Sequence, residues 1–190
     1  MSRIPKTIVW LLATGSCMAV IAAPAQARRA QPQRERVTGG QLAFAPSAAI
    51  TSLLQSHAIT ATPIAPASVV GGSFTMPIAS GHLQMPAMRG SITAQGVLQY
   101  TNGKKNLRIH GFTLTRSRHR TTLSAVVNGH RIKIAKLVGS TVTMSGATGT
   151  ITGVLKLSRF SAHRINHLVG KHVVSTGEEI GTLSATVTMA

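Results

Sequence analysis

Acidic side chains are nearly absent from this chain of 190 residues. It carries three Asp+Glu against 20 Lys+Arg, which gives a formal net charge of +17. None of the three acids is Asp: they are Glu35 and the adjacent pair Glu178 and Glu179. Glycosidases need two carboxylates across a cleft, and this shortage excludes most carboxylate chemistry.

Nucleophiles and aromatic side chains are also scarce. The chain has one Cys, one Trp, one Tyr and four Phe. It contains no Gly-x-Ser-x-Gly elbow, no phosphate-cradling glycine loop and no His-Glu-x-x-His pair. We therefore predict a protein that is not an enzyme. Its hydrophobic residues, 43% of the total, supply enough apolar material for one packed domain.

The first segment has the layout of a secretory signal peptide. Arg3 and Lys6 give a basic start, an apolar stretch covers Ile8–Ala23, and small residues end the segment at Ala27. This layout predicts cleavage after Ala27 and a protein that is secreted or associated with the cell envelope. The apolar stretch is too short and too interrupted for a membrane span of about 20 residues, and no later stretch approaches that length. No transmembrane span is therefore expected after cleavage.

Cys17 offers an alternative interpretation of this segment, because a lipid-modified Cys would anchor the chain to a membrane. The residues before it, Thr14–Ser16, lack the Leu that is usual three positions upstream. Cleavage after Ala27 would remove this Cys and the only Trp. The remaining chain cannot be a disulfide scaffold, so its stability must come from core packing.

Two regions follow the signal segment. Residues 28–39 are polar and basic without periodicity, which predicts a disordered lead-in. Residues 40–190 contain no linker, which predicts a single domain. Apolar and polar residues alternate through most of this region with the period of two that indicates strands.

Two Asn-Gly pairs predict β-hairpins, because a type I′ turn needs positive φ at both central residues. Around Asn128-Gly129, counting outward places Ala125 opposite Ile132 and Leu123 opposite Ile134. The apolar residues then share one face, and the other face is wet and basic, as in an antiparallel sheet with one buried side.

The second pair, Asn102-Gly103, places Tyr100 opposite Lys105 by the same count. The alternation changes phase near Gly111, which indicates a β-bulge. Further strands are predicted at Ser73–Ile78, Ser140–Met144, Thr150–Leu157 and Thr182–Met189. Several short strands at this spacing predict an antiparallel β-sandwich or a barrel-like domain.

Two segments break the alternation and resemble each other. Residues 46–62 and 161–177 align so that Ile50 matches Ile165 and Ile59 matches Val174. Each segment has apolar positions three and four apart after a Ser or Pro, which predicts a short helix followed by an extended segment. The predicted fold class is therefore mostly β with two short helices.

The order of these elements carries a family resemblance. A helix with Ile-x-x-Leu-Leu precedes several strands and an Asn-Gly hairpin, and a second helix precedes the last strand. The segments are Val70–Ile78, Gly90–Leu98, Leu107–Leu114, Phe160–Gly170 and Gly181–Val187. Over roughly Gly40–Ala190 the pattern resembles the HtaA-like secreted proteins of actinobacteria, whose better-known members are haem-binding domains of the cell surface. The resemblance implies a β fold, secretion and haem or a porphyrin as ligand.

The chain departs from that family at its iron ligands. Haem-binding members carry a Trp and a ligating Tyr near the domain start, where this chain has Phe44. They also carry a His within a Gly-His-x-Gly segment, where this chain reads Thr93-Ala94-Gln95-Gly96. The resemblance therefore implies the fold and secretion without those ligands.

Three side chains are candidate haem ligands. His163 and His167 stand four apart on the second predicted helix, and Arg159 and Arg164 beside them could meet haem propionates. The alternative is a solvated helix face, since no Cys, Asp or nearby Glu completes a metal set, and no metal site is predicted. Tyr100 is the only phenol, and its alternative is a rim aromatic with an exposed hydroxyl.

Basic residues are the most distinctive feature of the chain, and such a field attracts polyanions. The predicted anion-binding residues are Lys104, Lys105, Arg116, Arg118, Arg120, Arg131, Lys133, Arg159 and Arg164. The expected partner is an anionic polymer of the cell envelope. Specific nucleic-acid binding is not expected, because stacking aromatics are few. Three functions stay open: attraction of that polymer to a basic face, binding of haem or a porphyrin, and a structural envelope role without a soluble ligand.

Overall fold

The computed structural model describes residues 33–103 and 105–190. The predicted signal peptide, Cys17, residues 28–32 of the predicted lead-in, and Lys104 lie outside these ranges. Secretion and lipidation therefore stay predictions.

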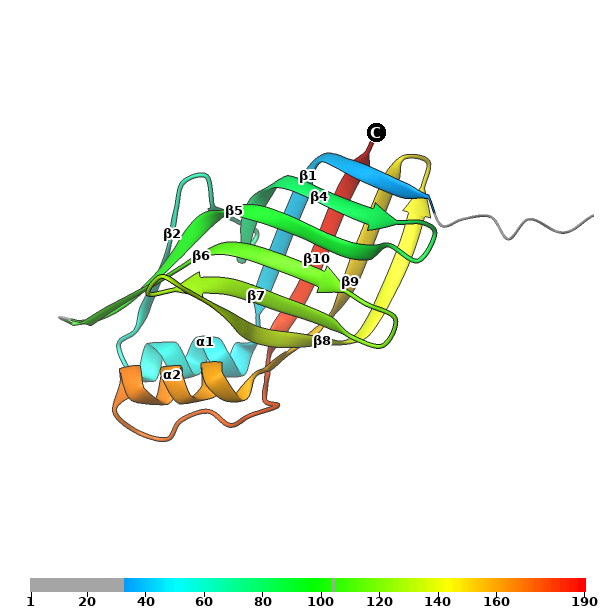
Figure 1. Ribbon diagram of the computed structural model, residues 1–190. Coiled ribbons are helices and arrows are strands. Elements are labelled where there is room, and N and C mark those ends of the chain that lie inside the picture. Colours follow the sequence, from blue (N-terminus) through cyan, green and yellow to red (C-terminus); the bar gives the residue numbers. More distant parts are fainter. Residues whose placement is uncertain (1–32, 104) are drawn as a thin grey trace, which may run out of the picture. The chain divides into compact units, whose positions relative to one another are not determined.

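The described part of the chain folds into ten strands and two helices (Figure 1). In chain order they are β1 (Arg34–Pro46), α1 (Ala48–Ser56), β2 (Thr60–Ile64), β3 (Ser68–Val70), β4 (Ser73–Gln84), β5 (Arg89–Asn102), β6 (Lys105–Arg116), β7 (Thr121–Val127), β8 (His130–Ser145), β9 (Thr148–Leu157), α2 (Arg159–Val169) and β10 (Glu179–Met189). The prediction of a mostly β domain with two short helices is confirmed. The four further strands predicted from the sequence lie within β4, β8, β9 and β10.

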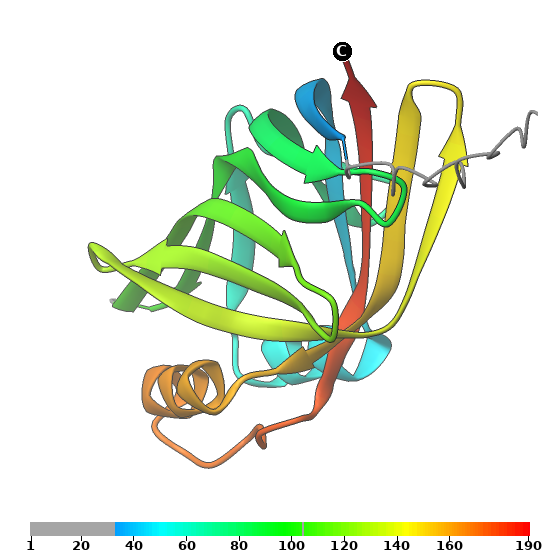
Figure 2. The ribbon, with the colours of Figure 1, turned by 45° about the vertical axis from the view of Figure 1, so that its right-hand side comes forward.

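The strands form one antiparallel sheet that closes on itself. Its order is β2-β5-β6-β7-β8-β9-β10-β1-β4-β3, and an additional pairing joins β5 to β4. Eight strands, β4 to β10 and β1, thus make a closed ring, with β2 and β3 outside it. Of the two predicted architectures, the barrel-like one is the observed one (Figure 2).

The ring is closed along only part of the boundary between β4 and β5. Residues Ile78–Gln84 of β4 pair with residues Arg89–Ala94 of β5. Beyond that stretch β5 pairs with β2 through Val97–Thr101 instead, and β4 pairs with β3 through Ser73–Thr75. The barrel is therefore parted at the end where β2 and β3 form its edges.

Strand β1 begins earlier than the sequence predicts. The prediction of a disordered lead-in up to residue 39 is wrong from Arg34 onward, where the chain pairs with β4 and then with β10. Val37 is buried, whereas Arg34 and Arg36 are exposed. The alternation of a strand is therefore present, but it covers few residues, and most of these are charged or polar. The hydrogen bonds that order this stretch come from strands distant in the sequence.

The hairpin at Asn128-Gly129 is confirmed near its turn. Both residues have positive φ, 51° and 78°, and Ala125 pairs with Ile132 as predicted. Further out, a bulge after Leu123 shifts the register, so Leu123 pairs with Ala135 and not with Ile134. A similar break in register lies between His110 and Thr113, which confirms the bulge predicted near Gly111.

The hairpin at Asn102-Gly103 has a different register from the predicted one. Asn102 pairs with Lys105 and Tyr100 pairs with Leu107, so the turn lies one residue later than expected. The predicted pairing of Tyr100 with Lys105 is therefore wrong. The partner of each β5 residue near this turn is therefore two positions further along β6 than predicted. Because side chains alternate between the two faces of a sheet, a shift of two positions keeps each side chain on its face. Its consequence is that Tyr100 lies beside an apolar neighbour.

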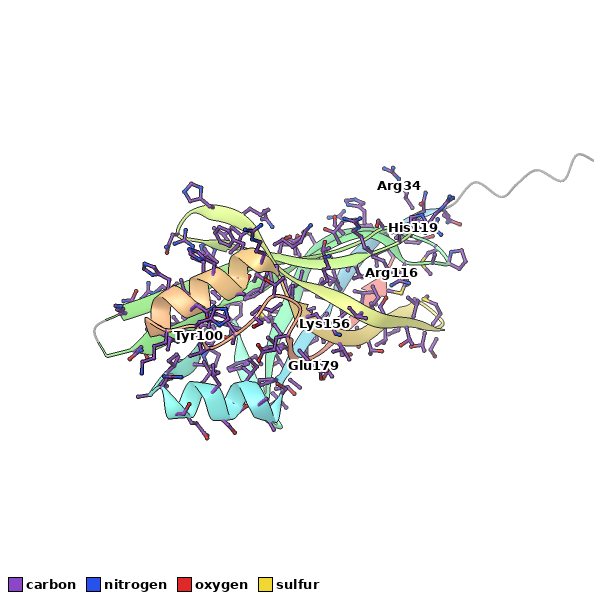
Figure 3. All side chains as sticks on the ribbon, turned by 90° about the horizontal axis from the view of Figure 1, so that it is seen from below. Arg34, Tyr100, Arg116, His119, Lys156 and Glu179 are labelled. Atoms are coloured by element: carbon purple, nitrogen blue, oxygen red, sulfur yellow. The ribbon has the colours of Figure 1, made fainter. Side chains whose placement is uncertain are left out.

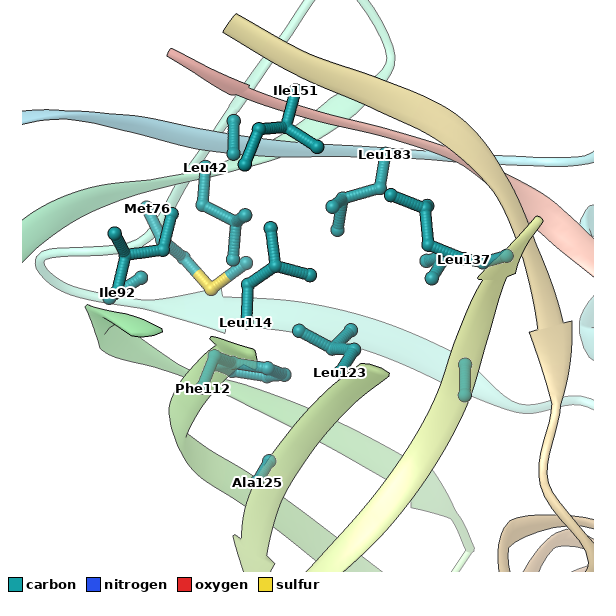
Figure 4. Packing of buried hydrophobic residues seen from close by; sticks show 14 of the residues in the cluster. Leu42, Met76, Ile92, Phe112, Leu114, Leu123, Ala125, Leu137, Ile151 and Leu183 are labelled. Atoms are coloured by element: carbon teal, nitrogen blue, oxygen red, sulfur yellow. The ribbon is translucent and has the colours of Figure 1, made fainter. Parts of the chain in front are cut away.

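The packed interior occupies the closed part of the barrel. Figure 4 shows side chains from strands all round the ring meeting there, among them Leu42, Met76, Leu114, Ile151 and Leu183, each at most 2% exposed. Both helices lie together at the other end of the barrel (Figures 1 and 2). Neither of them, in the part of the chain that the structure describes, has the length and hydropathy of a membrane-spanning helix.

Candidate functional site

An apolar cavity of about 120 Å³ lies between the packed interior and the two helices. Its inner wall includes Leu42, Met76 and Leu183, which belong to the core. Its outer wall includes Ile50, Leu53 and Leu54 of α1 and Ile165 of α2, and strands add Phe44, Phe74, Leu98, Leu107, Ile109, Phe112 and Ile134. Such a concave apolar space is the usual setting of a small-molecule site.

Among the described residues that line the cavity, Tyr100 is the one with a polar side chain. It stands near the end of β5, and Figure 3 places it between α1 and α2 when the barrel is seen from the helical end. Burial of the phenol raises the pKa of Tyr100 from its ordinary 10.0 to about 12, because an apolar environment disfavours the phenolate. At neutral pH the cavity therefore contains a neutral hydroxyl among hydrocarbon side chains. The predicted role of a rim aromatic opposite a lysine does not describe this environment.

The repeated segments supply matching positions to the cavity. Ile50 and Ile165, which align in the sequence, both line it from the two helices. Ile59 and Val174, the second aligned pair, line it from the segments that follow those helices. The repeat seen in the sequence thus corresponds to the two helices beside the cavity and the segments that follow them. The N-cap residues of these helices, Ser47 and Ser158, each accept a backbone N–H of the first helical turn.

The two helices differ in burial, and the start of each is tied to a strand. None of the residues of α1 is buried, although three of them face the cavity. The Ser47 backbone N–H before α1 donates to the Ile180 carbonyl of β10 at 3.0 Å. The start of α2 is tied to β8, because the Ser158 hydroxyl donates to the Lys133 carbonyl at 2.6 Å and its backbone N–H donates to the Ile134 carbonyl at 2.9 Å.

Asn166 is a structural residue of the site that sequence reasoning missed. Its side-chain oxygen accepts the N–H groups of Val173 and Val174 at 2.8 and 2.9 Å, and its amide nitrogen donates to the Val174 carbonyl at 2.8 Å. These bonds fold the segment after α2 back onto the helix and hold Val174 in the cavity wall. The signal in the sequence was a polar residue four after Ala162 and three before Val169, on the apolar side of the helix.

The two candidate histidines lie elsewhere on α2. His163 and His167 are both exposed, and neither lines the cavity. Their neighbours Arg159 and Arg164 are also exposed, and the Arg164 guanidinium lies 5.1 Å from the centre of the Phe160 ring. Among residues 33–103 and 105–190, no three His, Cys, Asp or Glu side chains are grouped to hold a metal ion.

The predicted anion-binding residues are spread over several elements. Lys105, Arg118, Arg120, Arg131, Lys133, Arg159 and Arg164 are exposed, Arg116 is half-buried, and Lys104 lies outside the described residues. Arg131 bonds within its own sheet, where it donates to Thr113 Oγ1 at 2.6 Å. Arg116 is anchored more deeply, because its guanidinium donates to Ser140 Oγ at 2.7 Å, to Thr121 Oγ1 at 3.1 Å and to the Ala87 carbonyl at 3.2 Å.

Comparisons with known proteins place this fold. No protein-family model matches the chain, and no curated protein matches it significantly. The C-terminal domain of HtaA from Corynebacterium glutamicum is similar in structure, with a TM-score of 0.70 and 15% identity over 82% of this chain and 99% of that one. The N-terminal domain of the same protein has a TM-score of 0.65 and 12% identity, over 81% of this chain and 98% of that one. The haem-binding protein HtaB of that organism has a TM-score of 0.57 and 14% identity, over 84% of this chain and 98% of that one. The chain therefore has an HtaA-like fold, as the order of its elements predicts.

Proposed function

We propose, starting from the HtaA-like fold, that this chain is a non-catalytic binding module that takes haem or a similar porphyrin between the barrel and its two helices. The observation that carries the proposal is the single phenol of Tyr100 within an otherwise apolar lining. A structural neighbour, HtaB, is a haem-binding protein, which supports the same ligand class.

The residues present suit such a ligand in kind. A porphyrin has apolar faces, and the cavity wall is hydrocarbon. Tyr100 would be the oxygen ligand of a ferric iron, since the histidines of α2 lie outside the cavity. Lys105 and Arg164 are exposed and stand close in sequence to the lining residues Leu107 and Ile165, so they are candidate partners of the propionates.

The size of the cavity sets a condition on binding. At about 120 Å³ it is smaller than the space that usually encloses a ligand, which is roughly 300–1,000 Å³. A porphyrin would therefore have to move the helices apart on entry. Helix α1, which has no buried residue, is the element that gives way.

A haemin titration of the purified protein tests the proposal. The wild type should give a saturable one-to-one Soret shift that persists in about 1 M salt, where ionic contacts are screened. Tyr100→Phe removes the ligand oxygen and keeps the ring, so it should shift the Soret band and weaken binding at least tenfold. The double variant His163→Ala/His167→Ala should bind as the wild type does.

The titration has two contrary outcomes. A wild type without a saturable shift overturns haem binding altogether. Binding that survives Tyr100→Phe and is lost in the double His variant overturns the role of Tyr100 and restores the histidine pair predicted from the sequence.

A second candidate function is attraction of an anionic partner to the basic surface. It is supported by seven exposed Lys and Arg side chains among the predicted residues, in a chain with only three carboxylates. Such binding should weaken steeply as salt is raised and should be unaffected by Tyr100→Phe.

A further inference from the structure

We propose that two adjoining depressions on the outside of the barrel form one groove that binds a linear polymer of phosphates. The proposal rests on the second candidate function and names its site and its class of partner. The groove is distinct from the apolar cavity, with which its lining shares only Leu157.

The first depression lies between the β6–β7 loop and strand β8. It measures about 460 Å³, and its basic lining residues are Arg116, Arg118, Arg120 and Lys136. His119 adds a fifth nitrogen side chain, and no carboxylate contributes to the lining. Figure 3 shows Arg116 and His119 close together at this end of the sheet.

The loop that carries these cations is fixed by its own hydrogen bonds. Ser117 donates to the Arg120 carbonyl through its backbone N–H at 2.9 Å and through its hydroxyl at 3.0 Å. Arg116, bonded to Ser140, Thr121 and Ala87, anchors the base of the loop to its neighbours. Arg118 and Arg120 are exposed above this fixed base, so their charges are displayed to solvent.

The second depression continues the first along β8. It measures about 630 Å³, and its basic lining residues are Lys133, Lys136, Lys156 and Arg159. Lys136 and Val138 line both depressions, so the two adjoin along β8. Together they are lined by seven different Lys and Arg side chains, and among the described residues neither lining includes an acidic one.

Two of these cations face each other in the bare protein. Lys136 and Lys156 are direct cross-strand partners on β8 and β9. Like charges in that position destabilise a sheet. On its other side Lys156 has one carboxylate, Glu179 of β10, as its cross-strand partner. An anion bound between the two ammonium groups would turn their repulsion into attraction.

The arrangement favours a chain of phosphates without bases. A single phosphate would occupy one of the two depressions, whereas an extended polyanion contacts the cations of both. Binding of nucleic acid usually adds several aromatic platforms for stacking. Among the described residues the groove has one Phe, Tyr or Trp side chain, Phe160, and the Arg164 guanidinium already lies over its ring. The one other aromatic ring in the lining is the imidazole of His119.

Binding of long-chain inorganic polyphosphate to the purified full chain tests the groove. Each phosphate contact changes the slope of log K against log salt by about 0.7 for a single strand, which is a factor of about 5 per contact at 0.1 M salt. Arg118→Gln/Arg120→Gln should therefore weaken binding about 25-fold and flatten the salt slope by about 1.4. Both substitutions keep the Ser117–Arg120 backbone bond, and circular dichroism verifies the fold.

The matched control removes the same charge from the sheet face. Arg34 and Arg36 of β1 are exposed, line neither depression and stand two residues apart, as Arg118 and Arg120 do. Arg34→Gln/Arg36→Gln should therefore weaken polyphosphate binding less than about threefold, through long-range attraction alone.

Each contrary outcome points to a different error. Equal losses in the two double variants overturn the groove and leave attraction to a general basic surface. A wild type that does not bind polyphosphate at 0.1 M salt overturns both. A thymidine oligonucleotide with the same number of phosphates that binds tighter than polyphosphate overturns the base-free partner.

Discussion

Removal of the Asn166 side chain should detach the segment that follows α2. In Asn166→Ala, three hydrogen bonds to Val173 and Val174 are lost together. Each is worth about 1 kcal/mol net, which gives about 3 kcal/mol in all. Partial solvent access lets water replace some of them, and Ala is the better helix former by about 0.5 kcal/mol. We therefore expect the free energy of unfolding to fall by about 2 kcal/mol.

Urea unfolding followed by far-UV circular dichroism measures this loss. The midpoint should fall while the m-value is unchanged, and the melting temperature should drop by roughly 4–8 °C for a domain of this size. Asn106→Ala is the control, because Asn106 is exposed on β6. A loss below about 0.5 kcal/mol, or one equal to that of the control, would refute the assignment of Asn166 as the residue that holds this segment.

Two further predictions concern the backbone and the phenol. At Gly40 φ is +135° and a Cβ would lie 2.1 Å from the Thr186 carbonyl oxygen, whereas at Gly39 nothing lies within 4 Å. Gly40→Ala should therefore destabilise the fold by on the order of 3 kcal/mol, and Gly39→Ala by less than about 0.5 kcal/mol; equal thermal melts would contradict the geometry. The raised pKa of Tyr100, about 12 against 10.0, means that the folded state holds this proton more tightly. Its stabilisation is complete below about pH 10 and is lost as pH rises toward 12. The loss is on the order of 1–2 kcal/mol, with allowance for solvent screening because the Tyr100 residue as a whole is half-buried. Urea unfolding at pH 9 and pH 11.5 measures how much free energy of unfolding is lost between the two pH values. The wild type should lose more than Tyr100→Phe by this amount, and identical losses in both proteins would contradict the prediction.

Local turn chemistry and alternation predicted most of the fold. Asn128-Gly129 turns as its residue types require, and Ala125 pairs with Ile132. The register failed where it depends on a bulge, as at Leu123, because an extra residue is accommodated by packing against the rest of the sheet and leaves no local sequence mark. The ordered position of Arg34 likewise comes from its pairing with Gln84 of β4, about 50 residues further along the chain.

The site was predicted in part. The sequence repeat that aligns Ile50 with Ile165 correctly predicted two helices of similar pattern, and these form the helical side of the cavity. The environment of Tyr100 was missed because its expected turn lay one residue too early, which replaced an apolar neighbour with a lysine. The pairing of Lys136 with Lys156 was also missed, since it depends on the adjacency of β8 and β9. The positions of the Lys and Arg residues in the sequence do not show which strands lie next to each other.

The closed and the parted end of the barrel differ in the effect that a substitution has on folding. Residues such as Leu114 and Ile151 fill the closed end, so substitutions there act directly on folding. The parted end is bordered by the edge strands β2 and β3 and by α1, which has no buried residue, so its side chains contribute less to stability. Under the proposed function, the lining at that end could exchange one ligand-binding group for another while the architecture persists. A scaffold of this kind lets its chemistry diverge at one end while selection for folding acts on the other.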